Sequence, residues 1–459
     1  MNAAEIRHLV MVQRKYFFDG HTLPVENRIQ ALKALKEGIE KHEAELQAAL
    51  LEDLGKSSTE AYMCETGMVL EELSYMLRHV KSFARDQRVK TPIHQYVAKS
   101  YKKPSPYGVT LIMSPWNYPV LLTMGPLVDA LAAGNTAIVK PSAYSPATSQ
   151  VMKEILEECF APEYVAVVTG GRAENTALLH EHFDYIFFTG SQTVGKEVMK
   201  AASEHLTPVT LELGGKSPCI VAEDANIRLA AKRIVFGKYL NCGQTCVAPD
   251  YIYVDRKVKH KLMAEIQKQI VRQYGKQPLT RKNYGKISNE KHFQRLCGLI
   301  DHDKVVWGGA SLEETLQIEP TVIDNVSFSD PIMQEEIFGP LMPILTFDHM
   351  QEVISNLNSM PHPLALYIYS NNKETIENVT SHVGFGGGCV NDCIIHLATT
   401  EMGFGGFGES GMGAYHGKTG FDTFSHYKSI VDKKTWIDLP LRYQPYRKIY
   451  EKVIRIFMK

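Results

Sequence analysis

The stretch Val109–Asn117, which reads VTLIMSPWN, decides the fold, because an apolar run too short for a helix ends there in a distinctive polar group. Similar short apolar runs follow at Thr136–Val139, Tyr164–Val168 and Tyr185–Phe188. Amphipathic stretches such as Ala147–Cys159 and Val194–His205 supply helices between and after them. Strands that alternate with helices in this way predict a doubly wound, mostly parallel sheet, and therefore an α/β fold.

Distinctive residues follow directly after each of these predicted strands. They are Ser114-Pro115-Trp116-Asn117, Lys140-Pro141-Ser142, Thr169-Gly170-Gly171 and Thr189-Gly190-Ser191. Ligands of open α/β sheets bind outside the carboxyl ends of the strands. We therefore expect a ligand to lie across this edge of the sheet.

The last of these groups continues into a predicted helix through Val194 and Gly195. Backbone amides at such a helix start suit a pyrophosphate, although the GxGxxG fingerprint is absent. A plain tight turn with Ser191 as the helix cap explains the same residues. The turn alone does not separate the two interpretations.

The rest of the chain divides around this region. Residues 1–85 have helical spacing, as in Arg28–Glu40, and residues 86–106 are polar and basic, with a predicted exposed strand at Val97–Lys103. A second α/β region begins at Pro208 and ends in a segment with ten glycines between Gly384 and Gly413. Such a segment favours tight turns over regular elements.

Composition excludes several classes of protein. The 459 residues carry 50 basic and 51 acidic side chains, so no net field attracts nucleic acid. Eight scattered cysteines do not form a disulfide framework, and the N-terminus lacks the apolar core of a signal peptide. The most apolar stretch, Val120–Gly134, is too short to span a membrane. We therefore expect a cytoplasmic enzyme with a small-molecule substrate.

Two cysteines lie in a small, polar, turn-like context, Asn241-Cys242-Gly243-Gln244-Thr245-Cys246. Cys246 could be a nucleophile, a small core residue, or one of a redox or metal-binding pair with Cys242. Nothing nearby completes a four-ligand metal set, and redox pairs more often have two intervening residues. Spacing alone leaves these alternatives open.

A lone carboxylate, Glu212, lies between leucines in Leu211-Glu212-Leu213-Gly214-Gly215-Lys216. Burial in apolar surroundings would raise its pKa toward that of a general base. A side chain that turns outward into solvent fits the same sequence.

Taken together, these residues resemble the aldehyde dehydrogenase superfamily, and most closely its class 3 or fatty-aldehyde branch. The resemblance runs nearly from end to end and rests on ordered motifs. They are Pro115-Trp116-Asn117-Tyr118-Pro119, Lys140-Pro141-Ser142, Phe188-Thr189-Gly190-Ser191, Leu211–Lys216, Gly243-Gln244-Thr245-Cys246, Glu335–Pro340 and Ser410–Lys418.

The resemblance implies that Cys246 is the nucleophile, Glu212 the general base and Asn117 an oxyanion donor. It implies NAD as cofactor, with NADP as an alternative, and no metal. Lys140 would contact a ribose, Glu336 the nicotinamide ribose, and Phe338 the nicotinamide ring. The cofactor-binding residues it implies are Ser114, Pro115, Trp116, Lys140, Ser142, Gly190, Ser191, Val194, Gly195, Leu213, Glu336 and Phe338.

It also implies an architecture. A Rossmann-type NAD(P)-binding domain would comprise residues 1–85 and 107–210, and an α/β catalytic domain residues 211–392. Residues 86–106 and 393–459 would form an oligomerisation arm and C-terminal tail of a homodimer. The expected substrates are medium- to long-chain aliphatic or aromatic aldehydes.

Three features depart from the family or remain open. Ala143 replaces a glutamate that many class 3 members carry, which removes a carboxylate that could repel the 2′-phosphate of NADP. Cys242 occupies a position that is often serine, and we hypothesise a reversible disulfide with Cys246. The tail Tyr446–Lys459 has no membrane span, but its amphipathic pattern allows either surface membrane contact or packing on the dimer.

Other enzyme classes compete with this interpretation. A cysteine hydrolase would use the same thiol but would not need Lys140 or Glu336. A CoA-acylating dehydrogenase commonly lacks the glutamate that Glu212 supplies. A non-enzymatic scaffold is disfavoured, because every required side chain is present.

Overall fold

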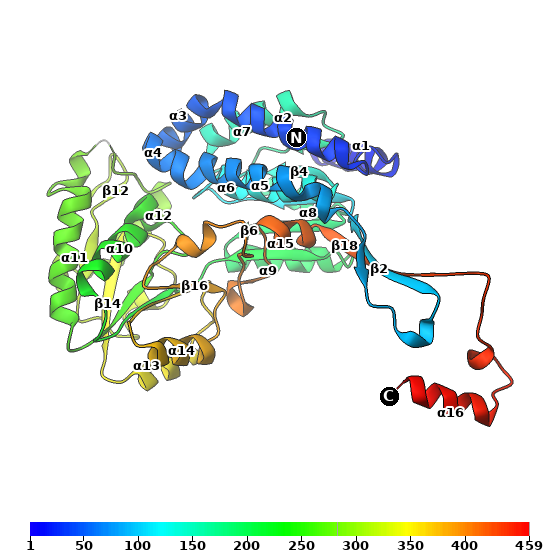
Figure 1. Ribbon diagram of the computed structural model, residues 1–459. Coiled ribbons are helices and arrows are strands. Elements are labelled where there is room, and N and C mark those ends of the chain that lie inside the picture. The colour runs from blue at the N-terminus through cyan, green and yellow to red at the C-terminus, as the bar shows by residue number, and fades with distance from the viewer. Residues whose placement is uncertain (282, 459) are drawn as a thin grey trace.

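A computed structural model describes residues 1–281 and 283–458 (Figure 1). Its first sheet has six strands in the order β17-β7-β6-β3-β4-β5, all parallel except β17. The strands are β3 (Val109–Met113), β4 (Thr136–Lys140), β5 (Val165–Val167), β6 (Tyr185–Gly190), β7 (Val209–Leu213) and β17 (Gly411–Met412).

Helices cover both faces of this sheet, because successive strand residues point to opposite sides. Val109, Leu111 and Met113 of β3 pack into one apolar cluster with helices α1, α8 and α9, whereas Ile112 packs into the larger cluster on the other face. The helices of this region are α1 (Ala3–Phe18), α2 (Val25–Lys41), α3 (Glu43–Leu54), α4 (Ser58–Ala61), α5 (Gly67–Phe83), α6 (Leu121–Ala133), α7 (Pro146–Cys159), α8 (Arg172–Leu179), α9 (Gln192–Ser203) and α15 (Gly417–Thr423).

The second sheet has seven strands in the order β10-β13-β14-β9-β8-β15-β16, and only β10 is antiparallel to its neighbour. The strands are β8 (Pro218–Val221), β9 (Tyr251–Asp255), β10 (Val305–Trp307), β13 (Thr321–Ile323), β14 (Leu341–Phe347), β15 (Ala365–Tyr369) and β16 (Gly387–Val390), beside a small pair, β11 (Ser311–Leu312) and β12 (Gln317–Ile318). The helices are α10 (Ile227–Tyr239), α11 (Lys259–Tyr274), α12 (Glu290–Gly298), α13 (Met350–Asn358) and α14 (Lys373–His382).

A third sheet forms an arm that projects from the body (Figure 1). Strands β1 (Gln87–Val89), β2 (Ala98–Pro106) and β18 (Ser425–Lys433) pair antiparallel in the order β1-β2-β18. Beyond it the tail ends in α16 (Lys448–Phe457), which stands apart from the body near the 93–95 turn. Within the described residues, no helix is long and apolar enough to cross a membrane.

The predicted α/β architecture with two sheets and a projecting arm is confirmed. All four predicted strands of the first sheet and both predicted crossover helices are present, with ends that shift by a few residues. The domain boundary expected between residues 210 and 211 falls inside β7, whose residues all pair with β6. Glu212 is thereby carried by the first sheet.

The glycine-rich segment differs from expectation. Gly387 and Gly388 lie in strand β16 rather than in a turn, and pair in parallel with β15. A Cβ on Gly388 would come within 2.1 Å of the Leu366 carbonyl oxygen, so glycine permits a backbone approach that a larger residue would block.

We expect Gly388→Ala to lower the free energy of unfolding by about 1–3 kcal/mol, because the added methyl overpacks the β15–β16 pair. Thermal and urea unfolding would measure the loss. Gly298→Ala is the control, since a Cβ there meets no atom within 4 Å at the end of α12. Equal stabilities of the two variants would contradict the prediction.

Candidate active site

The four polar groups that follow the strands of the first sheet lie side by side, because β6, β3, β4 and β5 are neighbours in it. Lys140, the last residue of β4, is buried and donates a hydrogen bond to the Pro141 carbonyl oxygen at 2.7 Å. Burial lowers its pKa to about 8. Among the described residues, its remaining N–H groups have no acceptor, which suits a ligand with hydroxyl groups.

The turn from β6 to α9 has the form expected of an anion site. The Ser191 hydroxyl accepts a hydrogen bond from the Val194 N–H at 3.4 Å, and Ser191 itself is exposed. A Cβ on Gly195 would meet Leu213 at 2.7 Å, so this glycine lets α9 pack closely on β7. The start of this 12-residue helix is therefore accessible at the sheet edge.

The side chains of Ser114 and Ser142 are used within the fold. The Ser114 hydroxyl lies 2.5 Å from the Thr123 hydroxyl, and Ser142 accepts a hydrogen bond from the Tyr144 N–H at 3.1 Å. Pro115 and Trp116 are half-buried after β3. A cofactor role of the two serines would therefore fall mainly to their backbone groups.

Glu336 and Phe338 come from the second α/β region and face the first. A Cβ on Gly214 would lie 2.0 Å from the Glu336 carboxylate, which places this group over the turn that follows β7. Burial, with a smaller contribution from Asp250, raises the pKa of Glu336 to about 8. The Phe338 ring meets the Trp116 ring edge to face at 5.5 Å.

The two candidate thiols occupy different surroundings. Asn241 and Cys242 both have left-handed backbones, with φ of 50° and 52°, which turns the chain sharply before Cys246. Cys242 is buried in the core of the second region, whereas Cys246 is partly exposed at the junction. The proposed Cys242–Cys246 disulfide stays a prediction, and the burial that raises the pKa of Cys242 works against it.

The Cys246 thiol lies within electrostatic reach of two carboxylates. Burial first, and then the charges of Glu336 and Glu212, raise its pKa well above the usual range. The backbone N–H groups of Cys246 and Val247 act in the opposite direction by hydrogen bonding. A positive charge bound beside this thiol would favour the thiolate.

Glu212 is 3% exposed, and within residues 1–281 and 283–458 neither of its carboxylate oxygens has a hydrogen-bond partner. Burial alone raises its pKa well above the usual range. The outward, solvated orientation that the sequence also allowed is therefore wrong. An unpartnered buried carboxylate beside a thiol is available to accept a proton from a bound water.

Asn117 bridges the two regions. Its side-chain Nδ2 donates to the Gln244 carbonyl oxygen at 3.0 Å, two residues before Cys246. An amide nitrogen carries two N–H groups, so one remains for another acceptor. The Asn117 carbonyl oxygen in turn accepts hydrogen bonds from Lys56 and Asn241.

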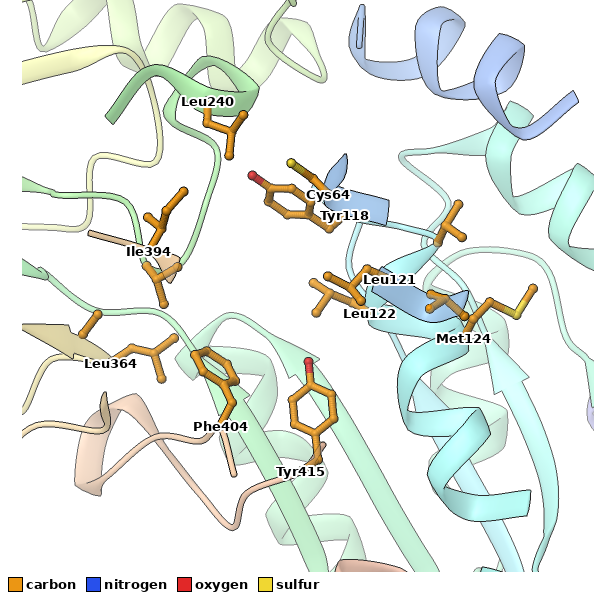
Figure 2. Packing of buried hydrophobic residues seen from close by; sticks show 14 of the residues in the cluster. Cys64, Tyr118, Leu121, Leu122, Met124, Leu240, Leu364, Ile394, Phe404 and Tyr415 are labelled. Carbon is orange, nitrogen blue, oxygen red and sulfur yellow. The ribbon is translucent and has the colours of Figure 1, made fainter. Parts of the chain in front are cut away.

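Apolar side chains from distant segments gather at the same junction (Figure 2). Burial raises the pKa of Tyr415 there, with smaller contributions from Glu212 and Cys246. Sequence reasoning missed this group, since no local pattern connects its members. They include Tyr118, Leu121, Leu122, Leu240, Leu364, Ile394, Phe404 and Tyr415.

The predicted site residues thus converge on one junction from both sheets, with a nucleotide-type edge on one side and a thiol and carboxylate on the other. No cluster of three or more metal-ligating side chains occurs in the described part of the chain. A doubly wound sheet edge combined with a thiol beside a buried carboxylate fits an oxidoreductase that works with a pyridine nucleotide.

Comparison with known proteins agrees with this class of enzyme. A model of the aldehyde dehydrogenase family matches residues 1–430. The 4,4'-diaponeurosporen-aldehyde dehydrogenase of Staphylococcus aureus is 44% identical over 97% of each chain. The dimeric NADP-preferring aldehyde dehydrogenase of Canis lupus familiaris is 42% identical over 96% of this chain and 98% of its own. The solved substrate-bound state of Staphylococcus aureus AldH has a TM-score of 0.98 at 43% identity, with full coverage of both chains.

The chain belongs to the aldehyde dehydrogenase family. It oxidises aldehydes to acids with NAD or NADP, as the family does.

If the Glu212 carboxylate limits turnover, kcat should rise with pH through the raised pKa of this group, because only the ionised form accepts a proton. Steady-state rates between pH 6 and 10 would measure this. Glu212→Gln should flatten the rise, whereas Glu223→Gln, which changes an exposed carboxylate, should not. The same rise in Glu212→Gln would assign it to another group.

Proposed function

We propose that this oxidation proceeds through a thioester on Cys246, with Asn117 as oxyanion donor and Glu212 as general base. The observation that carries the proposal is the buried Glu212 carboxylate, which has no hydrogen-bond partner among the described residues and lies within electrostatic reach of Cys246.

In the first half-reaction the Cys246 thiolate attacks the aldehyde carbon, and the carbonyl oxygen becomes an alkoxide. The free Asn117 N–H and the Cys246 backbone N–H would stabilise that charge where it develops. The cofactor, when bound, accepts a hydride from the same carbon. Collapse of the alkoxide to a carbonyl then leaves a thioester on Cys246.

In the second half-reaction Glu212 removes a proton from a water molecule, and the resulting hydroxide attacks the thioester carbon. The carbon–sulfur bond breaks, the carboxylic acid leaves, and the Cys246 thiolate is restored. The raised pKa of Glu212 makes it a stronger base than an exposed glutamate would be.

The residues at the sheet edge fit a dinucleotide. Lys140 would donate to ribose hydroxyls, the start of α9 with Ser191 would face the pyrophosphate, and Glu336 would accept from the second ribose. A cysteine hydrolase would have no use for these groups. A CoA-acylating enzyme would not need the base that Glu212 provides.

The apolar residues at the junction favour aldehydes with medium or long aliphatic chains, or aromatic rings. The relative named for 4,4'-diaponeurosporen-aldehyde supports a substrate of this apolar class.

The decisive experiment follows reduced-cofactor absorbance with a panel of aldehydes. Cys246→Ala should lose activity by about 10⁴-fold or more, because the nucleophile is gone. Cys242→Ala is the matched control and should remain active. Glu212→Gln should release about one equivalent of reduced cofactor per active site and then turn over about 10²- to 10⁴-fold more slowly. Undiminished oxidation in Cys246→Ala would overturn the mechanism.

We further propose that NADP is accepted alongside NAD. Ala143 supports NADP binding, because it places no carboxylate near the 2′-phosphate. The Glu174 carboxylate opposes NADP binding by charge repulsion, because it lies within electrostatic reach of Lys140 and accepts a hydrogen bond from the Gly171 N–H at 2.7 Å. Hydrogen bonds from the backbone lower the pKa of Glu174, so it stays ionised.

Glu174→Gln should therefore raise kcat/KM for NADP relative to NAD by about threefold to tenfold, through loss of repulsion with the 2′-phosphate. Initial rates with each cofactor would measure the ratio, with the exposed Glu157→Gln as control. A ratio that does not change would remove Glu174 from cofactor selection.

Homodimer formation and a cytoplasmic location are also proposals. Strand β18 is the edge of the arm sheet over nine residues, and Val431 on it is 50% exposed, which supports pairing with a second copy. Eight free cysteines support a reducing compartment. The exposed apolar residues Ile449, Ile456 and Phe457 of α16 fit either packing on that copy or weak contact with a membrane surface.

A further inference from the structure

Two buried charged residues have no part in the chemistry described above. Lys56 and Glu65 are 1% and 0% exposed, and their Nζ and Oε1 atoms lie 2.6 Å apart. Removing both charges from water costs several kcal/mol per ion, so such a pair is seldom kept for stability alone. Its other contacts indicate what it does.

The Lys56 ammonium contacts the segment that carries Asn117. It donates a hydrogen bond to the Asn117 carbonyl oxygen at 2.9 Å and lies 3.9 Å from the centre of the Tyr118 ring. The Tyr118 hydroxyl is 2.6 Å from the hydroxyl of Thr245, the residue before Cys246. Lys56 thus holds the Asn117 backbone against the nucleophile loop.

Glu65 holds the other end of the same segment. Its second oxygen accepts hydrogen bonds from the Val120 and Leu121 N–H groups at 3.0 and 2.9 Å, at the start of α6. These N–H groups have no partner within the helix. Lys56 therefore fixes this segment at Asn117, and Glu65 fixes it at Val120 and Leu121. The ion pair between the two side chains connects these two points.

The orientation of the Asn117 amide depends on that backbone. One N–H is committed to Gln244, so the direction of the remaining N–H follows from where the main chain at 117 lies. A donor misplaced by about 1 Å can cost on the order of a hundredfold in rate. A shift of this backbone would therefore weaken oxyanion stabilisation without removing the amide.

We infer that Lys56 and Glu65 are positioning residues that hold Asn117 in the orientation needed to stabilise the oxyanion. This inference rests on the proposed role of Asn117. Both side chains are buried and bond to the 117–121 segment, so we expect them to act on the reaction through Asn117.

A double-mutant cycle on the full-length enzyme separates positioning from a general structural role. Lys56→Met should lower kcat/KM for aldehyde by about tenfold to a hundredfold, while the Kd for reduced cofactor, measured by its fluorescence, changes less than about threefold. In an Asn117→Ala background, Lys56→Met should have less than about a threefold effect. An equal loss in both backgrounds would overturn the inference.

If Asn117→Ala itself retains full kcat/KM, the oxyanion role of Asn117 fails, and that outcome is distinct from failure of the positioning role. Lys259→Met is the matched control and should leave kcat/KM unchanged, because Lys259, at the start of α11, forms a largely buried pair with Asp324 after β13.

A truncated Lys56 could leave Glu65 unpaired and prevent folding. Lys56→Met combined with Glu65→Gln removes both charges and keeps an acceptor for the Val120 and Leu121 N–H groups. Glu65→Gln alone is a third, milder variant. Each should show a loss of kcat/KM that disappears in the Asn117→Ala background, and persistence of the loss there would count against positioning.

Discussion

The hydrogen bond from the Asn117 side chain to the Gln244 carbonyl oxygen helps to join the two α/β regions at the site. It connects the end of the first strand of the nucleotide sheet to the loop that carries Cys246. The polar groups at the edge of the first sheet belong to one region and the Cys246 thiol to the other, so the proposed mechanism requires the two regions to be held in register. Glu212 on β7 and Glu336 above it depend on the same register.

The fold could be predicted from the sequence to the extent that its signals are local. The runs around Val109–Met113 and Tyr185–Gly190 are short, apolar and bounded by turns, so the local sequence is enough to predict them as strands. The boundary near residue 210 was harder to place, because it cuts β7, whose ends are set by pairing with β6 and with the distant strand β17. Gly388 was expected in a turn for a similar reason, because its place in strand β16 depends on pairing with the Leu366 backbone in another segment.

The candidate site likewise contains residues that the sequence identifies and residues that only the folded structure identifies. Cys246 and Cys242 are equivalent by spacing, and family motifs rather than geometry distinguished them. Their different burial comes from packing that no local pattern encodes. Lys56 and Glu65 lie in what reads as an ordinary helical segment, and their ion pair is recognisable only once that segment is folded against Asn117.

The turn that presents Glu65 is a π-helix, Tyr62–Thr66, between α4 and α5. A π turn holds one more residue than the α-helix around it, and such turns often occur at functional sites. Loss of one residue here would restore a regular α-helix and remove the widened turn that carries Glu65. The Glu65 carboxylate would then leave its place beside Lys56 and the Val120 and Leu121 N–H groups. The length of this turn therefore matters to the site as much as the identity of its residues.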